Sequence, residues 1–106
     1  MDAAWLRKFT LIAQAEMPTR KYVQSISGAT QKAVLWTLFA HEGSPMSFQA
    51  IADRSGCSIG TAWRTVRLLV RMGVAVEHRT GARKAAAYTI NPEPLSGLVC
   101  RTPTVA

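Results

Sequence analysis

Apolar residues recur along the first two thirds of the chain with the period of an α-helix. They repeat every three or four positions within residues 3–17, 27–41, 47–54 and 58–72, so that one face of each segment is apolar. Pro18 ends the first segment, and a serine begins each of the other three, where its hydroxyl can accept a hydrogen bond from a free backbone N–H. The pattern therefore predicts four successive helices.

The period shortens to two after Gly73, which we expect to end the fourth helix in a left-handed conformation. Residues 74–78 and 84–90 predict two strands, and the glycine-containing segment 79–83 predicts the turn between them. Alternate residues of the second strand share one side: Ala86, Tyr88 and Ile90. A hairpin therefore follows the helices.

We predict three regions in the chain. Residues 1–26 form an N-terminal amphipathic helix and a basic connector, and residues 27–91 form the main domain. Residues 92–106 are expected to be a flexible C-terminal tail with one short apolar turn at Leu95, Leu98 and Val99. The apolar face of the N-terminal helix is predicted to consist of Leu6, Phe9, Ile12, Ala13 and Met17.

The basic residues are concentrated in one third of the sequence. The 106 residues include 13 Lys+Arg and 6 Asp+Glu, a net charge of +7. Residues 54–84 contain seven of the cations and one acidic residue, Glu77, so this segment alone carries +6. A localised basic patch is typical of a nucleic-acid-binding surface, although a solvated basic face would carry the same charge.

Other features exclude several classes of protein. The length and the 48% of apolar residues suit one compact domain with a modest extension, and no apolar run approaches the roughly 20 residues that cross a bilayer. Cys57 and Cys100 form neither a disulfide framework nor a metal site, which favours a reducing cytoplasm. No phosphate-loop, dinucleotide or zinc-protease motif is present, and His41 and His78 are isolated. We expect neither enzymatic activity nor a metal or organic cofactor.

The segment SFQAIADRSGCSIGTAWRTVRLLVRMGV resembles the helix-turn-helix of winged-helix DNA-binding proteins. Ala52 suits a close crossing of two helices, Gly56 a tight turn with positive φ, and Cys57 the small apolar position beside it. An arginine-bearing helix that ends in Met-Gly-Val and a basic hairpin that ends in Tyr-Thr-Ile extend the resemblance from residue 27 to residue 90. It implies a mainly α fold with a small β-hairpin wing, preceded here by an extra N-terminal helix.

The resemblance further implies double-stranded DNA as the partner and two contact regions. The second helix of such motifs inserts its N-terminal part into the major groove. On or beside its outward face we place Ser58, Ile59, Gly60, Thr61, Trp63, Arg64 and Arg67. In the wing we expect contacts to phosphates or the minor groove from Arg79, Thr80, Arg83 and Lys84.

Three of these residues have distinct expected roles. Arg64 is the best candidate for reading a base, because a guanidinium can bond guanine O6 and N7 together. Arg67 lies further along the helix and is expected to meet phosphate or solvent. Trp63 could contact a thymine methyl or the sugar backbone, but we favour its packing over the wing or against the N-terminal helix.

Three biological functions fit this pattern. The chain is similar to the DNA-binding modules of bacterial repressors, which implies a small transcriptional repressor or autoregulator in the bacterial cytoplasm, bound to a palindrome as a homodimer. The homodimer contact is assigned to Leu6, Phe9 and Ile12. The alternative is a plasmid or phage replication or partition protein on repeated sites, and a third possibility is a protein-interaction winged helix. No membrane partner and no small-molecule effector are expected, and the chain could be a fragment of a longer protein.

Overall fold

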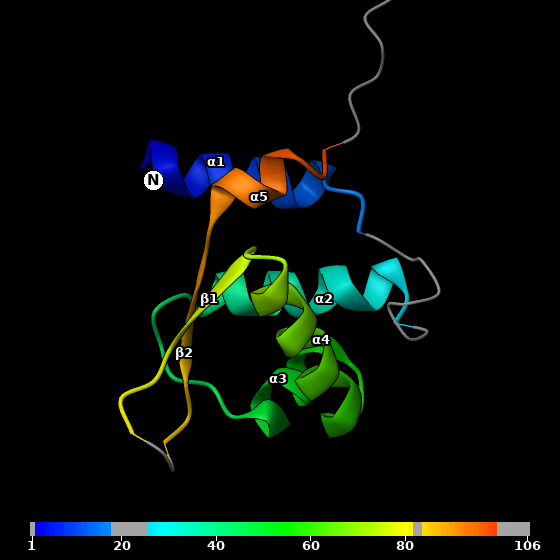
Figure 1. Ribbon diagram of the computed structural model, residues 1–106, viewed down its shortest axis with the longest axis vertical. Coiled ribbons are helices and arrows are strands. Elements are labelled where there is room, and N and C mark those ends of the chain that lie inside the picture. The colour runs from blue at the N-terminus through cyan, green and yellow to red at the C-terminus, as the bar shows by residue number, and fades with distance from the viewer. Residues whose placement is uncertain (1, 18–25, 82–83, 100–106) are drawn as a thin grey trace, which may run out of the picture.

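The described residues form five helices and one hairpin (Figure 1). The computed structural model describes residues 2–17, 26–81 and 84–99. The predicted mainly helical architecture with a hairpin after the helices is confirmed. In chain order the elements are α1 (Ala3–Gln14), α2 (Gly28–Ala40), α3 (Phe48–Ser55), α4 (Ile59–Arg71), β1 (Ala75–His78), β2 (Ala87–Ile90) and α5 (Pro92–Ser96).

Serine caps begin the three central helices, as predicted. The hydroxyl oxygen of each serine accepts a hydrogen bond, 3.1 Å long, from the backbone N–H three residues later. Each bond satisfies one of the N–H groups that the first turn of a helix leaves free. The three caps are Ser27, Ser47 and Ser58.

Two glycines turn the chain at the ends of α3 and α4. Gly56 has φ +76° and joins α3 to α4, and Gly73 has φ +79° and releases the chain into β1. A side chain is disfavoured at such angles, so glycine permits these abrupt turns. Both assignments from sequence are confirmed.

The core lies between α2, α3, α4 and the hairpin. Leu35, Ile51 and Leu69 are fully buried, one from each of the three helices. The strands pair antiparallel with Ala75 opposite Ile90 and Glu77 opposite Tyr88. As predicted, the buried side of the second strand segment consists of Ala86, Tyr88 and Ile90.

Helix α1 differs from the prediction in its end and its buried face. It ends at Gln14 rather than near Met17, because Ala15 adopts an extended conformation and forms a bridge with Val99. Ile12 is buried as expected, but Ala13 is exposed. The contact with the end of the chain therefore decides where this helix stops.

The predicted flexible tail is wrong for its first part. Residues 92–96 form α5, which begins at the cap Asn91 and lies beside α1 at one end of the molecule (Figure 1). Leu95 is fully buried, and the backbone N–H of Glu16 donates a 2.9 Å hydrogen bond to the carbonyl of Leu98. Residues 100–106, including Cys100, lie outside the described residues.

Glu42 connects α1 to the rest of the fold. Its Oε2 accepts a hydrogen bond of 2.7 Å from Lys8 Nζ and another of 2.7 Å from the backbone N–H of Ile90. One carboxylate thus links the first helix, the end of α2 and the second strand. Within the described part of the chain, no helix is long and apolar enough to cross a bilayer.

Candidate nucleic-acid interface

Helix α4 buries one face and presents the other to solvent. Its buried side chains are Ala62, Thr65, Val66 and Leu69, and the three apolar ones lie on the apolar face that the helical period predicts. The outward face carries two large apolar side chains, Ile59 at 48% exposure and Trp63 at 50%. Arg64 and Gly60 are exposed beside them. The structure thus brings four of the predicted residues together on and beside one surface, namely Ile59, Gly60, Trp63 and Arg64.

The first turn of α4 is held by hydroxyl groups. Ser58 Oγ donates to Thr61 Oγ1 at 2.9 Å while it caps the helix, and Thr65 Oγ1 donates to the Thr61 carbonyl at 2.7 Å. The Arg64 guanidinium makes one long contact of 3.5 Å with Thr61 Oγ1. That contact is weak, so the Arg64 guanidinium stays free to bind a ligand.

Trp63 does not pack as we favoured from sequence. Half of its side chain stays exposed, so Trp63 is not buried against the wing or the N-terminal helix. Helix α1 lies at the end of the molecule away from the start of α4 and the hairpin loop (Figure 1). The contact between α4 and the wing is made instead by Arg67 and Glu77.

Two of the predicted DNA-contacting arginines converge on Glu77. Arg67 Nη2 on α4 lies 2.6 Å from Glu77 Oε2, and Arg79 Nε at the end of β1 lies 2.7 Å from Oε1. The hydroxyl of Tyr88 donates to the same Oε2 at 3.5 Å. The Glu77 side chain is 15% exposed, compared with 34% for Arg67 and 43% for Arg79.

The charge state of Glu77 follows from these contacts. Burial raises the pKa of its carboxyl, but the Arg79 hydrogen bond and the charges of both arginines outweigh burial and hold the pKa below its ordinary value. Glu77 is therefore ionised at neutral pH. Sequence reasoning missed this cluster, although the strand register that sets Glu77 opposite the inward Tyr88 gives a signal for it.

The described part of the wing carries exposed cations. Arg79, Thr80 and Lys84 are exposed, and the Lys84 backbone N–H donates to the Gly81 carbonyl at 3.2 Å, which closes the hairpin loop. Arg83, the fourth residue assigned to the wing, lies outside the described residues. The arrangement places positive charge beyond the strands, as a phosphate-binding loop requires.

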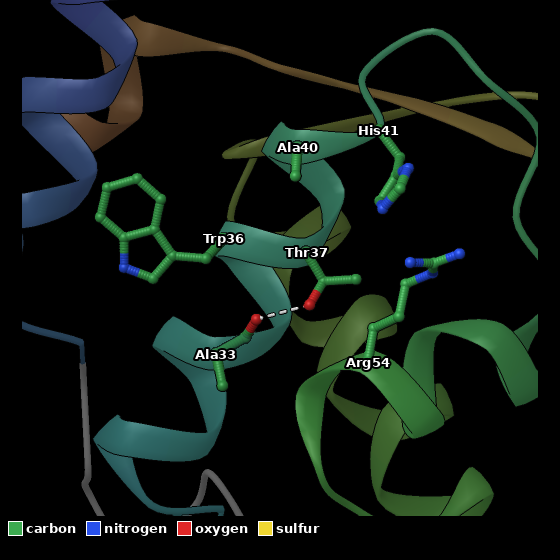
Figure 2. A pocket seen from close by; sticks show the side chains of 6 residues that line it. All are labelled: Ala33, Trp36, Thr37, Ala40, His41 and Arg54. Carbon is green, nitrogen blue, oxygen red and sulfur yellow. Dashed lines mark hydrogen bonds between the residues drawn. The ribbon is translucent and has the colours of Figure 1, made fainter.

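A separate hollow of about 500 Å³ lies between α2 and α3 (Figure 2). Figure 2 shows His41 and Arg54 on one side of it and the Trp36 ring on the other. The Thr37 hydroxyl donates to the Ala33 carbonyl at 2.9 Å, so this polar group is satisfied within the helix. None of the lining residues belongs to α4 or the hairpin, so the hollow is not part of the predicted interface.

Removal of the α4 cap should destabilise the domain. Ser58→Ala is expected to lower the free energy of unfolding by about 0.5–2 kcal/mol, because the Thr61 N–H loses its acceptor. Urea unfolding followed by circular dichroism measures the change, with Ser44→Ala in an exposed bend as the control. Equal midpoints for the two variants would contradict a stabilising cap at Ser58.

Comparison with known proteins identifies the family. The model of the IclR helix-turn-helix domain matches residues 36–88, which are half of the chain and run from α2 into β2. Neither a curated protein nor a solved structure matches the chain significantly. The matched domain is a DNA-binding regulatory unit and not a catalytic one. The chain therefore belongs to the IclR helix-turn-helix domain family, a winged helix-turn-helix family that binds double-stranded DNA in transcription regulation.

Proposed function

We propose that the chain is a sequence-specific repressor or autoregulator that binds a palindromic site as a homodimer in the bacterial cytoplasm. The observation that carries this proposal is the outward face of α4, where Arg64 is exposed beside two half-exposed apolar side chains, Ile59 and Trp63. A guanidinium suits guanine, and an apolar side chain suits the methyl group of thymine. This face therefore offers chemistry that distinguishes base pairs.

The exposed side of α1 supports the homodimer. Ile12, which the sequence also assigned to this contact, is fully buried and cannot take part in it, whereas Trp5, Leu6 and Phe9 are 40%, 52% and 42% exposed on α1. The Trp5 ring lies 5.3 Å from Phe9 and 5.4 Å from Phe39 between centroids, so the aromatic side chains are already held in place. A preorganised apolar surface of this kind suits a contact with a second copy, because few side chains need to be ordered on association.

Leu6→Glu is the test of this contact. We expect the wild-type chain to be a dimer at micromolar concentration and Leu6→Glu to weaken dimerisation at least tenfold, because a carboxylate would be buried in an apolar interface. Sedimentation equilibrium gives the dissociation constants. Ala4→Glu, which adds the same charge at an exposed position on the other side of α1, is the control and should remain a dimer. A wild-type chain that is monomeric both with and without DNA would refute the homodimer.

Selection of bound fragments from a genomic DNA library tests the proposed function. The repressor hypothesis predicts that the bound fragments share one inverted repeat at a promoter, and that footprinting protects both halves. Several direct repeats near an origin would favour a replication or partition protein instead. Failure to enrich any fragment over the input library would leave the proposal without support and would favour a role in protein contacts.

A further inference from the structure

Glu77 occupies the point where the recognition helix and the hairpin meet. It is the single acidic residue between positions 54 and 84, and both of its carboxylate oxygens accept hydrogen bonds from arginines. One arginine belongs to α4 and the other follows β1, so the carboxylate joins the two elements that are proposed to contact DNA. Tyr88 on β2 supplies a third contact to the same group.

A carboxylate at this position needs a physical explanation. A negative charge within a Debye length of the phosphates, about 8 Å at physiological salt, weakens attraction to DNA. Exposed ion pairs also contribute little to stability, but this carboxylate is mostly buried and occupied on both oxygens. A carboxylate held in this way fixes the positions of the groups that it binds.

The arginine contacts show what these positions are. The Nε of Arg67 is buried and has no hydrogen-bond partner in the described part of the chain. Leaving such a donor unpaired is unfavourable, so the ion pair with Glu77 must be what holds Arg67 in this position. Arg79 instead uses only its Nε on Glu77, and its two terminal amino groups make no hydrogen bond to the described residues.

We propose that Glu77 is a positioning residue for DNA recognition. Through Arg67 it fixes the hairpin against α4, and through the Nε of Arg79 it points the terminal amino groups of that arginine toward one phosphate beside the helix. Arg67 then has a structural role, and Arg79 binds the backbone. Glu77 thereby lowers total attraction to DNA but raises discrimination between sequences, since a fixed backbone contact sets the register of the base-reading helix.

The test compares Glu77→Gln with wild type on the selected duplex and on a scrambled duplex of equal length. This inference rests on the proposed sequence-specific binding. The variant removes one negative charge and keeps the shape of the side chain. Binding to the scrambled duplex should tighten about two- to threefold, because one repulsion is lost. Binding to the selected duplex should weaken, so that the ratio of the two affinities falls about tenfold, the size of effect expected when one base contact is misplaced.

Glu93→Gln on α5 is the matched control. It makes the same chemical change on a 74% exposed side chain at the end of the molecule that holds α1 and α5, and it should leave the affinity ratio unchanged. Should Glu77→Gln give the same ratio as Glu93→Gln, the positioning role is refuted. Wild-type protein that does not discriminate between the two duplexes refutes the proposed function and this inference together, so the two failures are distinguishable.

Arg79→Lys keeps the inference testable if Glu77→Gln does not fold. Arg79 is 43% exposed, so the fold tolerates the change, and the charge is retained. Lysine cannot bind Glu77 and a phosphate in the fixed fork of a guanidinium, so the affinity ratio should fall severalfold while scrambled binding stays constant. An unchanged ratio in this folded variant would overturn the proposal.

Discussion

Leu95→Ala is expected to lower the free energy of unfolding by about 2–5 kcal/mol, the range for removing a fully buried leucine side chain. Leu95 has no exposed surface and belongs to the same buried cluster as Ile12 of α1 and Leu69 of α4. Truncation would leave a cavity that the short α5 and its neighbours could close only in part.

Urea denaturation measures this change directly, and an exposed residue provides the comparison. Ile59→Ala truncates a side chain that is 48% exposed on α4, so it should shift the free energy of unfolding by about 0.5 kcal/mol or less in the absence of DNA. A Leu95→Ala variant as stable as Ile59→Ala would mean that α5 does not contribute to the core. The sequence-based expectation of a flexible segment from residue 92 would then be restored.

Local signals explain why most of the fold could be predicted. The serine caps of α2, α3 and α4 and the positive-φ glycines at 56 and 73 act over three or four residues, so they can be read without knowledge of the tertiary structure. The inward face of α4 follows from its helical period in the same way. These features place the helix-turn-helix and the start of the wing.

The errors lie where distant segments meet. Residues 92–106 are expected from the sequence to form a flexible tail, yet an asparagine cap at Asn91 followed by Pro92 also begins a helix, and docking against α1 decides between the two. The end of α1 at Gln14 depends likewise on the bridge between Ala15 and Val99. No local pattern contains this information.

In the candidate site, too, local features could be predicted from the sequence, whereas contacts between distant segments could not. The exposed position of Arg64 follows from helix geometry. The partly buried position of Arg67 depends on Glu77, ten residues later in the chain, whose Oε2 lies 2.6 Å from Arg67 Nη2, and the helical period of α4 does not predict this contact. The sequence favours packing of Trp63 over the wing or against the N-terminal helix. Arg67 and Glu77 instead occupy the contact between α4 and the hairpin, and the ring of Trp63 is left half exposed.

Arg64→Ala and Lys84→Ala should separate base reading from backbone binding. Arg64 projects from the second turn of α4 with only one long contact to Thr61, so its loss should cost about 1–3 kcal/mol on the selected duplex and much less on a scrambled one. Lys84 stands on the exposed hairpin and is expected to meet a phosphate, so Lys84→Ala should weaken binding to both duplexes about equally.

Salt titrations of both variants complete the separation, because each lost phosphate contact changes the salt dependence of binding. Lys84→Ala should reduce the slope of log K against log [salt] by roughly one unit, since about one fewer counterion is released. Arg64→Ala should change the slope less than Lys84→Ala does. Equal losses on both duplexes for Arg64→Ala would reassign Arg64 to the backbone. If neither variant changed the affinity, DNA would have to bind at a surface other than the outward face of α4 and the wing.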